Sequence, residues 1–462
     1  MNSKGPGRRR FLKEGAALAG LAVGAFRSAG GQTAAPEPPP EGRWPSYFKD
    51  TRAYGERSHY DTVSRWPIRP QVVTPDTPLY TVAAPRTPLE DIKGIITPNP
   101  LHFYTDAAAA FPLPDVDPQK WRMVIHGLVD HPMMLNLEEL QRLPSISRIC
   151  FLECTGNSPP RARNFPEFHE TAGKTHGNAA CAEWTGVLLS LILKECGIQK
   201  AASWIYAEGG EIARRAKTFQ LEKAMDDVIV AYAQNGEAIH PENGFPVRLI
   251  VPGWAGHNST KWLRRIKLVD RPQMAKDDMG FRQGPDGKWI GEKEFDPKSV
   301  ILYPSGGQRL TGGPGPYEIR GLAWTGADVI RRVEVTTDGG RTWKDAKLQE
   351  PILSKAFTRF VSPWNWNGEE TVIESRCTDE AGRTQMLLSA IRKQWGDNPD
   401  NWRSSESPGE RFSGTQPWVI LPDGSVHQAA FGPHMRPSAA PGTAASAAFP
   451  STVSGKDSSC FG

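Results

Sequence analysis

The sequence has few cysteines, and none is spaced to hold a haem or a metal cluster. Its six cysteines are spread over 462 residues, which is too few and too scattered for a disulfide framework. No Cys-x-x-Cys-His motif is present to attach a c-type haem, and no Cys-x-x-Cys pair is present for zinc or an iron–sulfur cluster. These absences exclude a covalently attached haem and cysteine-rich metal sites.

The sequence also lacks a membrane-length apolar run and a strong charge of one sign. No segment approaches the roughly 18 to 20 apolar residues that a spanning helix needs. The formal net charge is +4, and arginines at the N-terminus supply part of it, so the charge gives no reason to expect nucleic acid binding. A hydrophobic content of 38% and a charged content of 23% are typical of globular proteins. The length allows two or three domains.

Residues 1–30 have the pattern of a twin-arginine signal peptide. Three arginines, Arg8 to Arg10, precede a short apolar stretch over residues 16–26, and the small residues 28–30 offer a cleavage site. An exposed basic helix is the alternative. The signal predicts a periplasmic protein. It matters chemically because the twin-arginine route exports proteins already folded around a cofactor.

The next two segments differ in composition. Proline and polar residues dominate residues 31–95, which we interpret as a flexible leader followed by an extended arm on the surface. Residues 96–297 mix helical and strand patterns and predict an α+β domain. Its expected strands are residues 121–126, 228–232 and 247–251. Its expected helices are residues 137–143 and 187–196, the second ending at Gly197.

Short strands and frequent turns characterise residues 298–435 and predict an all-β sandwich. The expected strands are residues 317–324, 329–336, 358–361 and 371–378. An Asp338-Gly339-Gly340 turn leads into residues 341–348 and has the chemistry of a hairpin. Residues 436–462 are rich in Ala, Ser, Pro and Gly and predict a disordered tail.

The most informative stretch is residues 147–160. An apolar strand over Ile149–Leu152 leads Cys154 into a turn marked by Thr155-Gly156-Asn157. A thiol held at the exit of a buried strand is well placed to be a single, fixed metal ligand, and a thiolate is a soft, strong donor. A buried free cysteine is the alternative. We interpret Cys150, on the same strand, as a core residue. The remaining cysteines are interpreted as structural thiols (Cys181, Cys196 and Cys377) and a tail residue (Cys460).

This cysteine loop closely resembles that of the sulfite oxidase family, whose one conserved cysteine ligates molybdenum in a pterin cofactor. The resemblance extends over residues 95–433. Its landmarks, in order, are residues 154–157, 183–187, 235–236, 245–253 and 261–263. The second domain most resembles the molybdenum subunit of sulfane dehydrogenase. Residues 304–308, 321–324, 333–343 and 348–351 carry that similarity. The resemblance implies a molybdopterin-binding domain followed by an immunoglobulin-like dimerisation domain, and a homodimer formed through the latter.

The resemblance also implies a set of site residues. Cys154 is the implied metal ligand, and Cys154 and Arg248 are the implied catalytic residues. The implied cofactor-binding residues are Cys154, Thr155, Asn157, Arg248, His257, Asn258, Ser259 and Lys261. Arg248 and Lys261 would hold the anionic end of the pterin, because a guanidinium fork suits a phosphate; surface ion pairs are the alternative.

Other charged and titratable residues have less specific readings. Arg161 and Arg163 either add positive potential for an anion or are solvated. Arg264 and Arg265 are interpreted as a solvated face, with docking of an electron-transfer partner as a second reading. We interpret four isolated histidines as structural: His126, His169, His176 and His240.

Several positions depart from the family pattern on the substrate side. Thr105 and Ala107 stand where the family has an arginine and a histidine, and Asn243 stands where it has a histidine. No tyrosine lies between Tyr232 and Tyr303 to match the family's substrate-side tyrosine. These departures leave the substrate open.

Three functions are consistent with the sequence. The first is oxidation of sulfane sulfur on a carrier protein, with oxygen from water and electrons passed to a separate c-type cytochrome, which in the sulfane dehydrogenase group carries two haems. The second is oxidation of free sulfite, or the reaction of a related molybdenum enzyme with another small oxyanion or an S-oxide. The third is a binding or assembly role without cofactor, which metal analysis of the purified protein separates from the other two.

Overall fold

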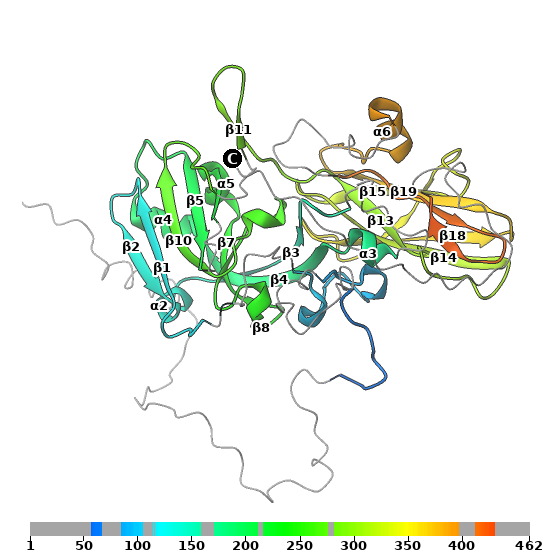
Figure 1. Cartoon of the computed structure of the whole chain (residues 1–462), viewed down its shortest axis with the longest axis horizontal. Helices are drawn as coiled ribbons and strands as arrows, with labels where there is room; N and C mark the ends of the chain where they lie inside the picture. Colours follow the sequence, from blue (N-terminus) through cyan, green and yellow to red (C-terminus); the bar gives the residue numbers. More distant parts are fainter. Residues whose placement is uncertain are drawn as a thin grey trace, which may run out of the picture.

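The computed structural model describes residues 57–66, 85–104, 114, 116–158, 171–210, 216–275, 281–396 and 412–429. The predicted signal peptide, most of the leader and the tail lie outside these ranges. So do Thr105, Ala107, Arg161, Arg163, His169 and Cys460. Two units lie side by side, the first coloured cyan to green and the second yellow to orange in Figure 1. The predicted domain limits at 96–297 and 298–435 stay predictions.

The first unit contains two five-stranded sheets. One has the order β2 (Met133–Asn136), β1 (Arg122–Gly127), β10 (Leu263–Val269), β5 (Trp204–Gly209) and β6 (Ala216–Gln220). Within it β1 and β10 are parallel, whereas the other neighbours are antiparallel. The other is an antiparallel sheet of β3 (Ile146–Glu153), β4 (Ala179–Leu188), β7 (Ile229–Gln234) and β8 (Glu237–Ala238), with β9 (Arg248–Ile250) beside β7.

Short helices and turns connect these strands. The α-helices of this unit are α2 (Leu137–Gln141), α3 (Ala172–His176), α4 (Leu189–Cys196) and α5 (Leu221–Asp226). The 3-10 turns are η3 (Leu89–Asp91), η4 (Asn99–Leu101), η6 (Pro241–Asn243) and η7 (Gly256–Asn258). A hairpin of β11 (Phe281–Gln283) and β12 (Trp289–Gly291) projects from the unit (Figure 1). In the described part of the chain, no helix is both long and apolar enough to cross a bilayer.

Most elements of this unit follow the sequence pattern, with ends shifted by a few residues. Helix α2 begins where Asn136 and Glu139 form a capping box. The predicted helix over residues 187–196 is wrong at its start, because Val187 and Leu188 pair with Val230 and Ile229 and complete β4. An apolar run alone does not distinguish a buried strand from a buried helix.

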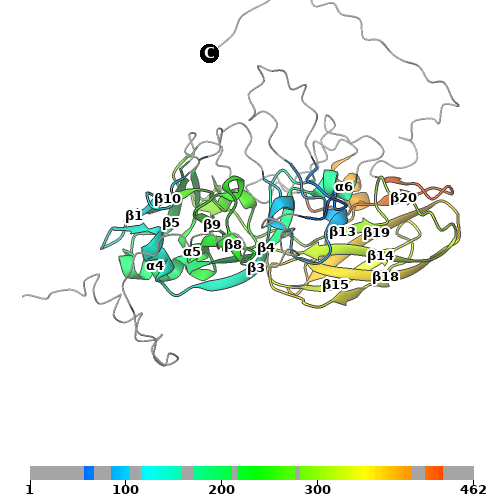
Figure 2. The same ribbon diagram turned by 90° about the horizontal axis from the view of Figure 1, so that it is seen from below.

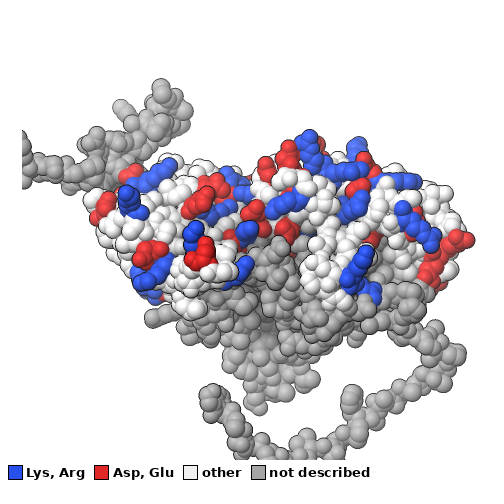
Figure 3. Space-filling view, turned by 90° about the horizontal axis from the view of Figure 1, so that it is seen from above, with Lys and Arg blue, Asp and Glu red and all other residues white. Residues whose placement is uncertain are grey.

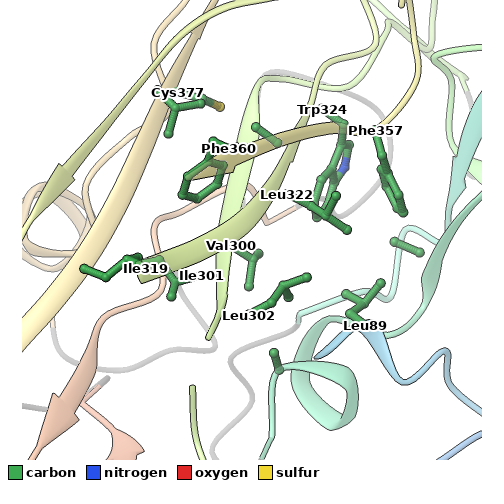
Figure 4. Packing of buried hydrophobic residues seen from close by; sticks show 14 of the residues in the cluster. Leu89, Val300, Ile301, Leu302, Ile319, Leu322, Trp324, Phe357, Phe360 and Cys377 are labelled. Carbon is green, nitrogen blue, oxygen red and sulfur yellow. The ribbon is translucent and has the colours of Figure 1, made fainter. Parts of the chain in front are cut away.

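The second unit is a two-sheet sandwich, which confirms the predicted fold class. One sheet has the order β13 (Lys298–Tyr303), β14 (Gly315–Trp324), β18 (Thr358–Trp366) and β17 (Lys347–Gln349). The other has the order β16 (Lys344–Asp345), β15 (Ile330–Thr336), β19 (Thr371–Asp379), β20 (Trp418–Ile420) and β21 (Val426–Gln428). Buried side chains including Leu322, Phe357 and Phe360 fill the space between them (Figure 4).

Two details of the sandwich differ from prediction. The Asp338 hairpin forms, but residues 341–348 do not make one strand. β16 pairs with β15 in one sheet, whereas β17 pairs with β18 in the other. One helix that the sequence did not predict, α6 (Leu388–Trp395), lies at the edge of the sandwich (Figure 1).

The end of the N-terminal arm is buried, not extended over the surface as predicted. Thr87 and Leu89 are fully buried, and Ile92 and Ile95 are nearly so. Leu89 and Ile95 join the same core cluster as the sandwich residues Val300 and Leu302 (Figure 4). The three apolar side chains at 89, 92 and 95 are spaced three residues apart, which places them on one buried side of the segment. The proline-rich composition of the segment had instead indicated a surface arm.

Strand β3 separates the two units (Figures 1 and 2). Its side chains alternate between faces, as those of any strand do. Cys150 and Leu152 pack in a cluster with Trp184 and Ile250 on the side of the first unit. Phe151 points the other way, stacking on Phe357 with ring centroids 6.5 Å apart. One strand therefore forms the wall of both units.

Two glycines bring the backbones of the units into direct contact. A Cβ atom on Gly253 would lie 2.2 Å from the carbonyl oxygen of Gly326, and one on Gly326 would lie 2.1 Å from that of Gly253. Phe295 bridges them, because its N–H donates to Gly253 and its carbonyl accepts from the Gly326 N–H. The junction therefore has no room for a side chain at either glycine.

Charges on the described surface are mixed. Lys and Arg side chains alternate with Asp and Glu over the described part of the face seen in Figure 3. Arg264 and Arg265, predicted to be solvated, are instead half-exposed and both bind the buried carboxylate of Glu208. The Arg264 Nε atom donates to Glu208 Oε1 over 2.7 Å. This pairing makes them poor evidence for a docking face.

Candidate functional site

A cavity opens where β3 ends, with about 770 Å³ of empty space, open solvent at its mouth included. Segments distant in sequence build its wall: the chain after η4, the end of β3, strand β6, the start of β9 and the loop around η7. The lining residues are His102, Phe103, Tyr104, Leu152, Cys154, Lys217, Asn243, Arg248, Gly256, His257, Ser259, Thr260, Lys261 and Trp262.

Cys154 reaches this cavity because it continues the alternation of β3. Like Cys150 and Leu152 before it, it packs on the side of the first unit. Its N–H donates to the Asn178 carbonyl and its carbonyl accepts from the Asn157 N–H, both over 2.9 Å. The thiol is thus presented from a backbone that hydrogen bonds hold on both sides.

The remaining predicted residues of the cysteine loop lie behind the cavity wall. Asn157 is 2% exposed. Its Nδ2 atom donates to Glu153 Oε1 over 2.8 Å, and its Oδ1 atom accepts from the Asn178 N–H over 3.0 Å. Neither Asn157 nor Thr155 is among the cavity-lining residues. Asn157 shapes the loop that carries Cys154, and a direct contact of either residue with a cofactor stays a prediction.

Three cations line the cavity. Arg248 is buried, and its two terminal nitrogens donate to the carbonyls of Asn243 (2.8 Å) and Ser259 (3.0 Å). The Lys261 Nζ atom donates to the carbonyl of Glu242 over 2.9 Å. Lys217, on β6, is 7% exposed. Three positive charges at one cavity favour an anionic group there.

The loop around η7 carries the other predicted residues. Ser259 lines the cavity, while its Oγ atom accepts from the Val251 N–H over 3.0 Å. Asn258 is fully buried behind the loop, where its Nδ2 atom donates to Glu292 Oε2 over 2.5 Å. His257 lines the cavity, and its Nε2 atom lies 3.0 Å from the same carboxylate oxygen. The structure thus brings Cys154, Arg248, His257, Ser259 and Lys261 together and leaves Thr155, Asn157 and Asn258 outside the lining.

Buried polar atoms at the cavity that lack a hydrogen-bond partner among the described residues include His102 Nε2 and Asn243 Nδ2. The His102 Nδ1 atom lies 2.8 Å from the Phe103 carbonyl, which can only accept, so Nε2 carries no proton. Burial, together with the nearby charges of Arg248, Arg65 and Lys261, lowers the pKa of His102 to about 3. Buried polar atoms are rarely left unpaired, so the cavity offers one acceptor and one donor to a polar ligand.

A buried ion pair supports the cysteine loop from the other side of β3. The Glu153 side chain is 2% exposed and that of Lys298 is 1% exposed, with Nζ 2.7 Å from Oε1. The Trp324 indole N–H donates to Glu153 Oε2 over 2.6 Å. Lys298 and Trp324 belong to the sandwich, so the second unit holds the residue next to Cys154.

The network continues through the described C-terminal segment. Lys298 also donates to Ser158 Oγ over 2.8 Å, and Ser158 Oγ lies 2.5 Å from His176 Nδ1. The His176 Nε2 atom lies 3.3 Å from the Gln416 amide oxygen. That oxygen accepts, so Nε2 carries the proton and Nδ1 accepts from the Ser158 hydroxyl. Each group in this chain has a partner of the correct polarity.

Sequence reasoning missed six residues of this arrangement: His102, Lys217, Glu292, Glu153, Lys298 and Trp324. His102 lies in a loop that the sequence comparison examined only at Thr105 and Ala107. Glu153 had a local signal, because a charged residue interrupts a buried apolar strand and such a charge is paired. Its partner Lys298 had none. Cys150, Cys181, Cys196 and Cys377 are buried free thiols, and burial raises the pKa of Cys181 to about 12.

Family models match both units of the chain. Residues 110–276 match the oxidoreductase molybdopterin binding domain, and residues 290–385 match the Mo-co oxidoreductase dimerisation domain. Among curated proteins, the chain is similar to NADH nitrate reductases. The tomato (Solanum lycopersicum) enzyme is 32% identical over 335 residues, which is 63% of this chain and 36% of that protein. The Cichorium intybus enzyme is 33% identical over 309 residues, or 59% and 32%. The chain thus spans about a third of their length.

A solved structure covers more of the chain. The crystal structure of the sulfane dehydrogenase SoxCD from Paracoccus pantotrophus matches with a TM-score of 0.71 and 33% identity. The match covers 82% of this chain and 94% of that one.

The fold and the cavity therefore define a molybdopterin oxidoreductase with a dimerisation domain. The chain belongs to the sulfite oxidase family of Mo-co oxidoreductases. Its cofactor is molybdenum–molybdopterin. The cavity fits that group, because it offers one thiol, three cations and two unpaired polar atoms at a single wall. No cluster of three or more His, Cys, Asp or Glu side chains in the described ranges could hold a metal by itself.

Proposed function

We propose that this protein oxidises sulfane sulfur bound to a carrier protein in the periplasm and passes the electrons to a c-type cytochrome. The main support is the placement of the Cys154 thiol in the wall of a cation-lined cavity, within a chain that matches a sulfane dehydrogenase over 82% of its length. The twin-arginine pattern of residues 1–30 supports the location. The dimerisation domain supports a homodimer.

The protein's own groups have distinct tasks in this proposal. When bound, molybdenum–molybdopterin supplies the two-electron oxidation and the transfer of an oxygen atom that comes from water. Cys154 would hold the metal, and Arg248 and Lys261 would hold the anionic end of the pterin. His102 Nε2 would accept a hydrogen bond from a donor of the bound group, and Asn243 Nδ2 would donate one. Because the sequence has no haem-attachment motif, electrons would leave to a separate protein.

The decisive experiment compares substrates on one preparation. The chain is expressed in a host that makes molybdopterin, its molybdenum content is measured, and reduction of a c-type cytochrome is followed. We expect turnover with thiosulfate sulfur conjugated to a carrier protein and little with free sulfite. Absence of molybdenum would favour the binding or assembly role, and turnover of free sulfite alone would overturn the sulfane proposal.

Free sulfite is the second candidate, and the cations favour it. Lys217, Arg248 and Lys261 around one cavity would suit a small oxyanion as well as a cofactor phosphate. Thr105, outside the described residues, stands where the family has an arginine. If sulfite binds there, Thr105→Arg should lower the KM for sulfite, whereas an unchanged KM would count against a sulfite site at that position.

A further inference from the structure

The proposed reaction needs a proton acceptor, and the following inference rests on that function. Each oxygen atom transferred from water to reduced sulfur releases two protons and two electrons. The electrons pass singly to the haem protein that serves as acceptor. The protons must first bind to a group at the cavity, because a proton acceptor has to lie within hydrogen-bond reach of the water it serves, directly or through one further water.

Few side chains in the cavity wall can accept a proton. Lys217, Arg248 and Lys261 carry positive charge and have no lone pair to offer. His102 is a weak base and a poor proton acceptor, because burial lowers its pKa to about 3. Hydroxyl and amide groups are weaker bases still. Among the described lining residues, with Cys154 assigned to the metal, His257 is the remaining base.

A carboxylate supports His257 from behind. The Nε2 atom lies 3.0 Å from Glu292 Oε2, and the Glu292 side chain is 1% exposed. Glu292 directly follows β12, and Asn258 donates to the same oxygen. A carboxylate at this distance attracts an imidazolium through its charge once the ring has taken up a proton. The His257 side chain is 19% exposed, so it contacts solvent as well as the cavity.

We infer that His257, beside the charge of Glu292, accepts the protons released from water and passes them to solvent. A proton moves from the water to the imidazole, which becomes a cation beside the Glu292 carboxylate, and then from the imidazole to bulk water. No redox change occurs on either residue. The charged side chains that line the same cavity are Lys217 on β6, Arg248 on β9 and Lys261 on the same loop as His257.

The test replaces each of the two residues with glutamine, which is neutral and of similar size. His257→Gln should lower kcat about 100-fold, the lower range for loss of a general base, with a smaller change in KM. Added imidazole should restore turnover in proportion to its concentration. Glu292→Gln should cause a smaller loss and alter the pH profile. His240→Gln is the matched control, because His240 Nε2 lies 3.3 Å from Glu237 outside the cavity; it should keep wild-type turnover.

A second readout does not depend on turnover. With 13C-labelled histidine, the NMR signal that disappears in His257→Gln should change its chemical shift in Glu292→Gln at one fixed pH, and it should keep its position in His240→Gln. Molybdenum content and thermal midpoint are measured for every variant. If the wild type is active and His257→Gln has the same kcat with no response to added imidazole, this inference is overturned and the proposed function stands. Molybdenum-loaded wild type without activity on any sulfur substrate would overturn the proposed function and this inference together.

Discussion

The two faces of β3 differ in whether the buried polar groups beside them have hydrogen-bond partners. On the cavity face, His102 Nε2 and Asn243 Nδ2 lack partners among the described residues. On the sandwich face, both oxygens of Glu153 are bonded, one to Lys298 and Asn157 and the other to Trp324. Unpaired buried groups destabilise a fold unless a ligand satisfies them. The difference indicates that one face is built to receive a ligand and the other to hold its ligand-bearing loop still.

We expect the largest effect from removing the Cys154 thiol on the cavity face. Cys154→Ala should abolish turnover and strongly reduce molybdenum content, because no other described thiol lines the cavity. Cys150→Ala is the control, since Cys150 is a fully buried thiol on the same face of the same strand. It should retain molybdenum and activity. Equal molybdenum content in both variants, measured by elemental analysis, would show that Cys154 is not a ligand.

Disrupting the buried ion pair between Glu153 and Lys298 on the sandwich face should lower the stability of the fold. Lys298→Met leaves the Glu153 charge buried without its cation, and breaking such a pair costs about 3–5 kcal/mol. The double variant Glu153→Gln with Lys298→Met should recover part of that loss, because no unpaired charge remains. Urea unfolding of the four proteins in a double-mutant cycle measures the coupling. Additive effects would show that the pair contributes no net interaction.

A smaller change on the same face removes one hydrogen bond. Trp324→Phe deletes the indole N–H that donates to Glu153 Oε2 over 2.6 Å. Hydrogen bonds to charged groups contribute about 1.5–3 kcal/mol, so unfolding free energy should fall by about that amount. Trp366→Phe is a matched control, because its indole N–H donates to a backbone carbonyl away from the cysteine loop. Only Trp324→Phe should also reduce molybdenum retention on prolonged dialysis.

The smallest effect concerns pH. Burial, with the nearby Lys298 charge, holds the pKa of His176 well below its usual value of about 6.5. Below about pH 6.5 the unfolded chain therefore binds a proton that the folded protein does not, so stability falls on acidification. The contribution approaches about 1.4 kcal/mol per pH unit. His176→Gln should flatten the dependence of unfolding free energy between about pH 5 and 6.5. His59→Gln, at an exposed position, should leave it unchanged.

Local sequence patterns were enough to predict much of the fold but only part of the candidate site. Alternation and turn residues were enough for β14, β15 and β19, because each buries one face against the opposite sheet. The β3 run predicted a strand, and its period placed Cys154 on one side. Lys217 and Lys298 could not be found this way, since each reaches the site only through the tertiary structure. The buried end of the arm was missed because its composition resembled that of a linker.

The contact between Gly253 and Gly326 also limits how this protein can be changed. The two residues lie in the regions matched by different family models, yet each excludes a side chain on the other. A chimera that takes its dimerisation domain from a relative therefore needs glycine at both positions, whatever the rest of the graft contains. For protein engineering, the two domains therefore cannot be exchanged as independent modules at this junction.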